Sequence, residues 1–430
     1  MNSYIPHILG LSIKLLGAVS VLAANLVITR TFESGQAGFH LYAMAAALFL
    51  SSVSAGGLQE VTLRRVSILC SEGRHEQARL FVASTSMLAG SIGLVFSILT
   101  IIVSGFVSSL TFSSLEFKSI LTSYSLAVPF LAASYVLSAG LQGFRMAIKS
   151  TATLNVISNL VFAISVPVLQ RFGEYSAGAI FVFASFGSFA FGAYWLRLRR
   201  AEPVSLLFNR RVEIYGYFDI FVFNLLSQAN FWLGTLLSGI LLSAEGVVVI
   251  SVGQRLAMVQ NLATLAVALI DAPNYASMFS RGDRRGLQEV ISRSSLIMFL
   301  FAMPFFLILI LVPEFVLSFF GIYSAAAELA LRVMAVGQFV SVMLGPVGHL
   351  LLMTGHERIV RNTIIVTLTV SAGLMVLGYS LLGLVGVAFA ISLSSVAPKL
   401  IFAYFAQKRL QVHIYPNRAI YSLWRNRRDR

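Results

Sequence analysis

Long apolar stretches, separated by short polar connections, dominate the pattern along the chain. A helix needs about 20 mostly apolar residues to cross the hydrocarbon core of a bilayer. Stretches of that length recur from one end of the sequence to the other, and they predict about twelve transmembrane helices. The expected limits are 8–29, 38–60, 80–106, 119–142, 151–170, 175–196, 213–241, 246–272, 294–319, 325–353, 361–381 and 384–406.

Basic residues gather on alternate connections between these stretches. The connections on one side carry Arg64, Arg65, Arg74, Arg79, Arg145, Lys149, Arg197, Arg199, Arg200, Arg210, Arg211, Arg281, Arg284, Arg285, Arg293, Arg358 and Arg361. Those on the other side hold only Arg30, Lys118 and Arg171. Cytoplasmic loops are the basic ones in membrane proteins, so both termini are expected in the cytoplasm of a bacterial inner-membrane protein. The first span has no basic segment ahead of it and is expected to be a membrane helix, not a cleaved signal.

An internal repeat suggests how the spans are grouped. The segment "CSEGRHEQARLFVASTSM" from Cys70 resembles "FSRGDRRGLQEVISRSSL" from Phe279, and "GFRMAIKSTATLNVIS" from Gly143 resembles "GHERIVRNTIIVTLTV" from Gly355. Both pairs are separated by about 210 residues, as expected for a duplicated six-span unit whose copies point the same way. The predicted organisation is an N-terminal lobe at 1–200, a cytoplasmic linker at 201–212, a C-terminal lobe at 213–406 and a basic tail at 407–430. The expected fold class is an all-α integral membrane protein, with two six-helix lobes around a central cavity.

Composition agrees with a membrane protein. The chain is 57% hydrophobic and 11% charged, whereas soluble domains average about 45–50% and about 25%. The net charge of +14 follows from the loops that set the orientation. The expected partners of these basic residues are therefore membrane lipids, and no nucleic-acid partner is expected. One cysteine, Cys70, allows no internal disulfide, and it is expected to be a thiol without chemistry.

Charged residues inside spans are costly and suggest function. Arg255 is the first candidate, because it lies roughly 13 Å inside its span, near the middle of the bilayer. Gln254, Gln260 and Asn261 add polarity to the same helix. Part of this helix is therefore expected to face water, although a structural ion pair with an acid such as Asp219 is the alternative.

Three further intramembrane charges are candidates with open alternatives. Lys14 either binds substrate or reaches the membrane surface as an anchor. Asp219 shares the seventh span with Asn224 and Gln228, and either pairs with a base or carries a coupling proton. Arg332 is a weaker substrate-binding candidate, because its i, i+4 spacing from Glu328 favours a local ion pair.

Other polar or helix-breaking residues favour packing roles. His40 and His349 are lone histidines, expected in core or interface packing. The residues expected to bend helices inside spans are Pro129, Pro167, Pro304, Gly345 and Pro346. The sequence contains no Walker A pattern, no Cys/His metal cluster and no recognisable Ser-His-Asp arrangement, so neither a cofactor nor a metal nor an enzymatic activity is expected.

The opening spans, "NLVITRTFESGQAGFHLYAMAAALFLSSVSAGGLQEVTLRRV", resemble polysaccharide and oligosaccharide flippases of the multidrug/oligosaccharidyl-lipid/polysaccharide exporter superfamily. The similar features are a Gly-x-x-x-Tyr from Gly38 to Tyr42, and a Gly-rich exit at Gly56-Gly57 before Arg64-Arg65. The stretch "AEGVVVISVGQRLAMVQ" resembles the eighth span of that family through Arg255-Leu256-Ala257. One departure is Asn230, where many members carry an acid late in the seventh span.

The resemblance implies export of a lipid-linked sugar, typically an undecaprenyl-diphosphate oligosaccharide, for O-antigen, capsule or exopolysaccharide synthesis. A polysaccharide polymerase and glycosyltransferases would be its protein partners. Buried Arg and Lys would bind the diphosphate. A cation-coupled multidrug exporter of the same superfamily is the alternative, and a membrane polysaccharide polymerase is a weaker one, because no long outer loop is expected.

Overall fold

The structure is a computed structural model that describes residues 5–169, 176–197, 211–262, 264, 267, 278, 281 and 283–411. The side chains of residues 5–14 and 211–220, and those of Phe223, His349 and Met353, lie outside what it describes. All regular secondary structure in the described residues is helical, which confirms the all-α fold class. The chain divides into two compact units, Met1–Val248 and Val249–Arg430.

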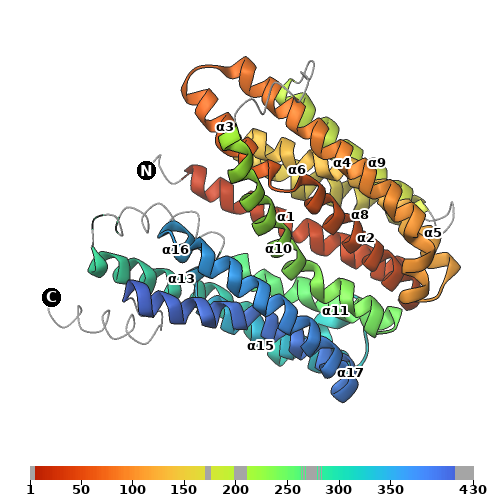
Figure 1. Ribbon diagram of the computed structural model, residues 1–430. Coiled ribbons are helices and arrows are strands. Elements are labelled where there is room, and N and C mark those ends of the chain that lie inside the picture. The colour runs from red at the N-terminus through yellow and green to blue at the C-terminus, as the bar shows by residue number, and fades with distance from the viewer. Residues whose placement is uncertain are drawn as a thin grey trace. The chain divides into compact units, whose positions relative to one another are not determined.

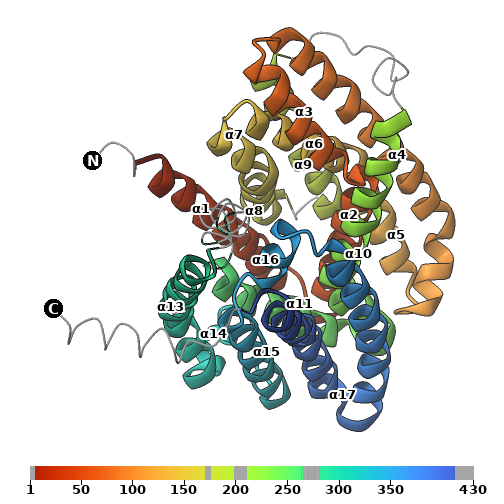
Figure 2. The same ribbon diagram turned by 60° about the vertical axis from the view of Figure 1, so that its left-hand side comes forward.

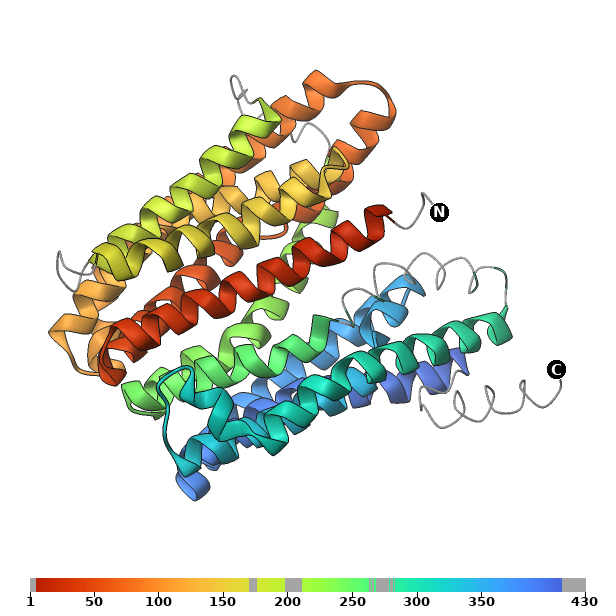
Figure 3. The same cartoon turned by 180° about the vertical axis from the view of Figure 1, so that it is seen from behind.

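The first unit contains the helices up to the start of α11. They are α1 (Ile5–Thr31), α2 (Ser34–Ala55), α3 (Leu58–Ser71), α4 (His75–Leu110), α5 (Leu115–Ser125), α6 (Val128–Gly143), α7 (Ala147–Thr151), the π-helical turn η1 (Ala152–Val156), α8 (Ile157–Leu169), α9 (Ser176–Leu196) and α10 (Arg211–Leu241). Figure 1 shows these elements, and Figure 3 shows α1 in red beside α8 in yellow, which it contacts.

Helix α6 is central to the packing of the first unit, since it contacts α2, α3, α4 and α9. Leu137 and Leu141 of α6 are fully buried in a cluster with Val66 of α3 and Val82 of α4. A second cluster joins α6 to the α2–α3 junction and to α4 through small and branched apolar side chains. Close contacts between helices through such residues are typical of membrane bundles.

The second unit begins within α11 (Ala244–Met258). It continues through the 3₁₀ turn η4 (Val259–Asn261), α13 (Arg284–Leu311), α14 (Pro313–Ser318), α15 (Ala325–Met343), α16 (Val347–Met353) and α17 (Glu357–Leu410). Here α15 has the central place, because it contacts α13, α17 and η4; Figure 2 shows α15 beside α17. Non-helical backbone at Gly383 (φ 56°, ψ −131°) divides α17 into the expected eleventh and twelfth spans.

Several expected spans contain breaks whose positions the apolar pattern did not reveal. The second span ends at Ala55, where two glycines with positive φ turn the chain into α3. The fourth is interrupted between α5 and α6, with Pro129 in the first turn of α6. The tenth is broken between α15 and α16, where Gly345 has φ +74°, a conformation that L side chains rarely adopt. By contrast, α8 and α13 continue through Pro167 and Pro304.

Exposed apolar side chains line the long helices. On α4, Ile102 is 71% exposed and Phe106 is 70% exposed, while the opposite face carries buried alanine, serine and glycine. A soluble monomer rarely shows contiguous apolar patches of more than a few hundred Å². Eight described helical segments are individually long and apolar enough to cross a membrane, and one of them, α17, contains two spans. The chain is a multi-pass membrane protein.

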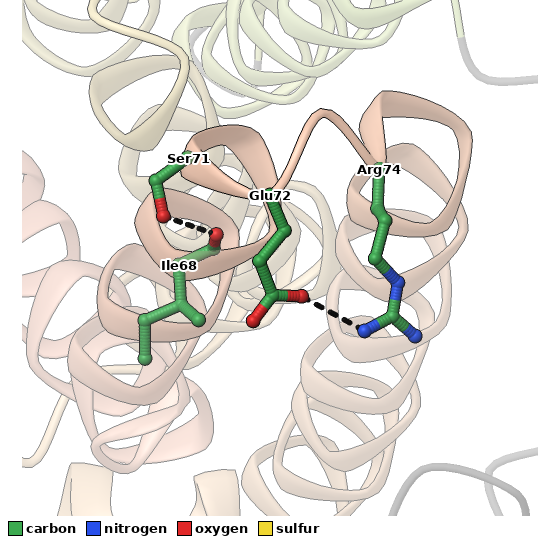
Figure 4. A network of polar contacts seen from close by, with 4 residues as sticks. All are labelled: Ile68, Ser71, Glu72 and Arg74. Carbon is green, nitrogen blue, oxygen red and sulfur yellow. Dashed lines mark hydrogen bonds and ion pairs between the residues drawn. The ribbon is translucent and has the colours of Figure 1, made fainter.

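The turn between α3 and α4 illustrates how one basic connection is organised (Figure 4). The guanidinium of Arg74 pairs with the carboxylate of Glu72 at 2.8 Å, and Ser71 Oγ donates to the Ile68 carbonyl at 2.7 Å. Gly73, at φ +74°, lies at the reversal between the two helices. Within this turn an acidic neighbour therefore compensates one of the arginines that are expected to set the orientation.

The sequence motif from Gly38 to Tyr42 has a packing role in the first unit. A Cβ on Gly38 of α2 would overlap the backbone of Ala244, the first residue of α11. Tyr42, one turn later, packs edge-on against the rings of Phe112 and Phe117. The glycine is therefore required by this close approach of two backbones.

The packing units and the expected lobes are different divisions of the chain. The units follow contacts, and α10 belongs to the first because it packs on α2 and α3. The lobes were inferred from a repeat, and most of the expected linker at 201–212 lies outside the described residues. The lobe limits 1–200 and 213–406, like the basic tail at 407–430, therefore stay predictions.

Candidate functional site

Helix α11 carries the strongest candidate, Arg255, in the second unit. The residue lies roughly 16 Å along the helix from Ala244, at about 1.5 Å per residue, and its side chain is partly buried. Gln254 beside it is also partly buried, and both side chains interact with other residues. Their neighbours Val252 and Ala257 are buried and apolar. A permanent charge in such surroundings is costly, which is why its position suggests a function.

Buried polar atoms without partners gather on the same segment. Within the described residues, they include Ser251 Oγ, Gln260 Oε1, Asn261 Oδ1 and Thr264 Oγ1. The large majority of buried polar atoms in proteins are hydrogen-bonded, so each exception calls for an explanation such as a ligand or solvent. The segment 251–264 thus combines a cation with several groups that are available for binding.

Gln260 fixes this segment against α15. Its side chain is fully buried, and Nε2 donates to the Ala335 carbonyl at 3.3 Å. Gly253, two turns earlier, lies against Met334 of the same helix. Arg255 therefore sits in the chain between two positions that are held on α15. Gln260 was expected only to add polarity; the structure gives it this positioning contact as well.

Arg332 makes the local contact that its spacing predicted. Its Nη2 lies 3.9 Å from Glu328 Oε2, one turn earlier on α15, and its Nε donates to the Ile310 carbonyl near the end of α13 at 3.2 Å. A partly exposed pair at this distance contributes little stability. The i, i+4 pair is therefore confirmed, while a role of Arg332 in substrate binding stays a prediction.

The expected polar residues of the seventh span lie on α10 in the first unit. Asn224 is buried, and its Nδ2 donates to Glu60 Oε1 of α3 at 3.1 Å. Gln228 is partly buried. The side chains of Asp219 and Lys14 lie outside the described residues, so their expected roles stay predictions. Glu60 was not singled out from the sequence, because it falls at the edge of the expected second span.

The lone histidine of the second span packs as expected. His40 is 1% exposed, and its ring lies 4.2 Å from that of Phe32 and 5.7 Å from that of Tyr124, centroid to centroid. Neither ring nitrogen has a hydrogen-bond partner within the described residues. The side chain of His349 lies outside what the structure describes. Among the described residues there is no group of His, Cys, Asp or Glu that could hold a metal ion.

One intramembrane cation was missed by the sequence reasoning. Lys399 lies in the second part of α17, directly after Pro398, and its Nζ donates to the Ser341 carbonyl of α15 at 2.8 Å. The signal was present, since "SSVAPKLIFAYF" places a lone charge inside the expected twelfth span. The segment that carries Arg255 and the helix that carries Lys399 thus both pack on α15.

Comparisons with known proteins identify the fold. No family model matches the chain, and no curated protein matches it by sequence. Among solved structures, an inward-facing multidrug resistance MATE family transporter of the MOP superfamily is similar, with a TM-score of 0.76 and 15% identity over 94% of this chain and 98% of that one. The lipid II flippase MurJ, in an inward closed conformation, gives a TM-score of 0.72 and 15% identity over 93% and 87%.

A third similar structure is a MOP superfamily transporter from Pyrococcus furiosus, in which the reverse polarity of the binding pocket suggests a different function. It gives a TM-score of 0.64 and 16% identity over 95% of this chain and 94% of that one. Because a multidrug transporter and a lipid flippase are both among the similar structures, the likeness concerns architecture. This chain has the fold of the MOP superfamily transporters.

Proposed function

We propose that this chain is a transporter that moves a lipid-linked oligosaccharide, carried on a prenyl diphosphate, from the cytoplasmic to the outer leaflet of a bacterial inner membrane. The observation that carries the proposal is the charge on α11. Arg255 lies deep in an apolar helix, on a segment rich in buried polar atoms that have no partner among the described residues. A midmembrane cation of this kind suits an anionic cargo.

The chemistry of the segment matches a diphosphate headgroup. A guanidinium binds phosphate oxygens through charge-assisted hydrogen bonds, often two at once. These bonds are stronger where water is scarce, because the local dielectric constant is low. The amides of Asn261 and Gln260 and the hydroxyl of Thr264 would bind sugar hydroxyls or the bridging region. The prenyl chain would stay in the lipid, and only the headgroup would need a polar route.

Transport of this cargo needs no nucleotide. With the cytoplasm negative, outward movement of one negative charge gains about 2.3 kcal/mol per 100 mV. The membrane potential alone would therefore favour export of an anionic headgroup. Coupling to a cation through Asp219, Asn224 and Gln228 is a separate prediction, and interactions with a polymerase and glycosyltransferases are another.

The test is flipping of a fluorescent prenyl-diphosphate oligosaccharide by the purified chain in liposomes. Arg255→Ala is expected to lower the rate by roughly tenfold or more, since hydrogen bonds to charged groups contribute about 1.5–3 kcal/mol. Arg255→Lys is expected to keep part of the activity, because the charge remains while the planar fork is lost. The matched control is Arg293→Gln, which removes an exposed arginine of α13 in the same unit.

Two results would contradict the proposal. Equal flipping by Arg255→Ala and the wild-type chain would remove Arg255 from the mechanism. If the folded wild-type chain flips no prenyl-diphosphate sugar, this class of lipid is not its substrate.

A cation-coupled drug exporter is the second candidate, favoured by the acid of the first unit. Glu60 receives hydrogen bonds from Asn224 at 3.1 Å and from Gln59 at 2.9 Å. A carboxylate held in place by amides could bind a cationic drug or a coupling ion. This alternative predicts transport of a cationic dye that depends on Glu60 and not on Arg255.

A further inference from the structure

Lys399 lies well inside the twelfth span. It is roughly 16 Å along the helix axis from the end of α17 at Leu410, and roughly 24 Å from the break at Gly383, at about 1.5 Å per residue. Side chains on a helix lean toward its N-terminus, which for this helix means away from Leu410. With the expected orientation, the amino group therefore does not lean toward the cytoplasmic surface, as an anchoring lysine would.

The lysine is on the packed side of its helix. Ser392 and Phe402, which share its face at helical spacing, are buried, whereas Leu400 and Tyr404 on another face are 50% and 58% exposed. The side chain of Lys399 itself is partly buried. Its position thus differs from that of the apolar residues expected to contact lipid.

The acceptor of Lys399 is a carbonyl that the helix break sets free. In a continuous helix the Ser341 carbonyl would accept from the backbone N–H of Gly345. Here the Gly345 N–H donates to the Val342 carbonyl at 2.9 Å instead, and Pro346 has no N–H to offer. Lys399 Nζ donates to the Ser341 carbonyl at 2.8 Å in place of that backbone N–H. One of the three ammonium protons is accounted for in this way.

Within the part of the chain that the structure describes, no carboxylate compensates this charge. Arg74, Arg79 and Arg332 each lie beside a glutamate, whereas the partner of Lys399 is a neutral carbonyl. A charge inside the membrane normally pairs with another charge or with backbone carbonyls, and it often marks a path for substrate or ions. A single neutral carbonyl leaves most of the cost of burying an ammonium unmet.

The register of α15 relates Lys399 to the segment of Arg255. Gln260 bonds to the Ala335 carbonyl, and Lys399 bonds to the Ser341 carbonyl. The lysine is therefore held roughly 9 Å farther along α15 than Gln260, toward the C-terminal end of that helix. The second unit thus carries two intramembrane cations on elements that meet α15 at different depths.

We infer that Lys399 is a second anion-binding residue of the transporter, whose ammonium binds a phosphate oxygen of the headgroup at a different depth from Arg255. The inference rests on the proposed function, because it assigns Lys399 to the same cargo. With the expected orientation, Lys399 lies nearer the cytoplasmic side, so it binds the headgroup before Arg255 does. When the phosphate binds, the two remaining ammonium protons donate to it, while the bond to Ser341 keeps the amino group in position.

The experiment measures binding by the purified full-length chain in detergent, with farnesyl diphosphate as the probe in isothermal titration. Lys399→Gln is expected to weaken binding by roughly tenfold or more, and Lys399→Arg is expected to restore most of the affinity because the charge returns. Lys408→Gln, which removes an exposed lysine of the same helix, is the matched control and should bind like the wild-type chain.

Further arms separate the sources of the phosphate. Inorganic diphosphate and phosphatidylglycerol are titrated in parallel. Tighter binding of farnesyl diphosphate than of either, with a dependence on Lys399, supports the transported lipid. Dependence on Lys399 for phosphatidylglycerol alone would overturn the inference in favour of an ordinary membrane-lipid site.

A purely structural lysine gives a different pattern. In that case Lys399→Gln lowers the melting temperature and leaves the affinity unchanged, and the inference is wrong. If Lys399→Gln does not fold, the inference is tested by reductive methylation of the wild-type chain. Farnesyl diphosphate should then protect Lys399, and not Lys408, from methylation, as measured by mass spectrometry. Methylation of Lys399 to the same extent with and without farnesyl diphosphate would overturn the inference.

The outcomes also separate this inference from the proposed function. If Arg255→Ala loses binding of farnesyl diphosphate while Lys399→Gln binds like the wild-type chain, the proposed function is supported and the inferred role of Lys399 is wrong. If the wild-type chain binds no prenyl diphosphate, both the proposed function and the inference are wrong.

Discussion

The two units of this protein use different polar chemistry between their helices. In the first, hydroxyl groups join helices: Ser51 of α2 donates to the Val128 carbonyl, Thr62 of α3 bonds to Thr85 of α4, and Ser188 of α9 donates to the Thr153 carbonyl. In the second, Ser392 of α17 likewise donates to the Val333 carbonyl of α15, but longer side chains converge on α15 as well. Gln260 donates to the Ala335 carbonyl and Lys399 donates to the Ser341 carbonyl.

This difference indicates separate roles for the two kinds of contact. Hydroxyl bonds between helices are neutral and contribute about 0.6 kcal/mol each on average, so they align helices at little electrostatic cost. A charged side chain inside the membrane costs more and is retained where it binds something. The first unit thus has the chemistry of a scaffold with one acid–amide contact, and the second carries the cations on which the proposed anion binding depends.

The largest effect on stability is expected from a substitution in the apolar core of the first unit. Leu137→Ala should lower the free energy of unfolding by about 2 kcal/mol or more, because Leu137 is fully buried and its loss leaves a cavity. Its control, Ile102→Ala, removes a side chain that is 71% exposed and should change stability little. Unfolding in sodium dodecyl sulfate measures both.

Binding of farnesyl diphosphate by folded Leu137→Ala should match that of the wild-type chain. A loss of affinity as large as that of Arg255→Ala would break the contrast between a scaffold and a binding surface.

A smaller effect on stability, and a sharper one on function, is expected at the acid–amide contact. In Glu60→Gln, the side-chain oxygen can still accept from Asn224, so the contact survives and stability should fall by about 1 kcal/mol or less. If the cargo is an anionic lipid, flipping by this variant should stay near that of the wild-type chain. Transport of ethidium by the wild-type chain, lost in Glu60→Gln, would instead favour the drug exporter.

The smallest expected effect is on the alkylation rate of Cys70, which lies in α3 outside the membrane spans. Burial raises the pKa of its thiol above the usual value, and the positive charge of Arg145 opposes that shift. The thiolate is the reactive form, so alkylation at neutral pH should be slower than that of a free cysteine and should accelerate as the pH rises toward the thiol pKa.

The same reaction tests the orientation. A membrane-impermeant maleimide should label Cys70 in inverted vesicles and not in right-side-out ones, with Cys70→Ser as the unlabelled control. Labelling from the outer side would reverse the expected topology and, with it, the order in which Lys399 and Arg255 meet the cargo.

Much of the architecture could be predicted from the sequence because membrane insertion depends on local properties. Apolar length identifies a span whatever its neighbours are, and the long described helices fall on the expected stretches, whereas α3 and α7 lie mainly in expected connections. Arg255 was recognisable for the same reason, since its depth follows from its distance along one helix. The i, i+4 pair of Arg332 and Glu328 is equally local, and it forms.

Contacts between distant segments were decided only by the tertiary structure. Nothing near Glu60 in the sequence indicates Asn224, and nothing near Lys399 indicates that the break after α15 frees the carbonyl of Ser341. The position of such a break depends on one glycine conformation and one missing N–H, and its consequence depends on which helix packs beside it.

The sequence by itself determined the all-α membrane fold class and the presence of a charged residue within an apolar helix, because each depends on residues close together in the chain. Only the packed structure decided the partners of the polar groups, because a hydrogen bond in the membrane joins whichever helices the fold brings together.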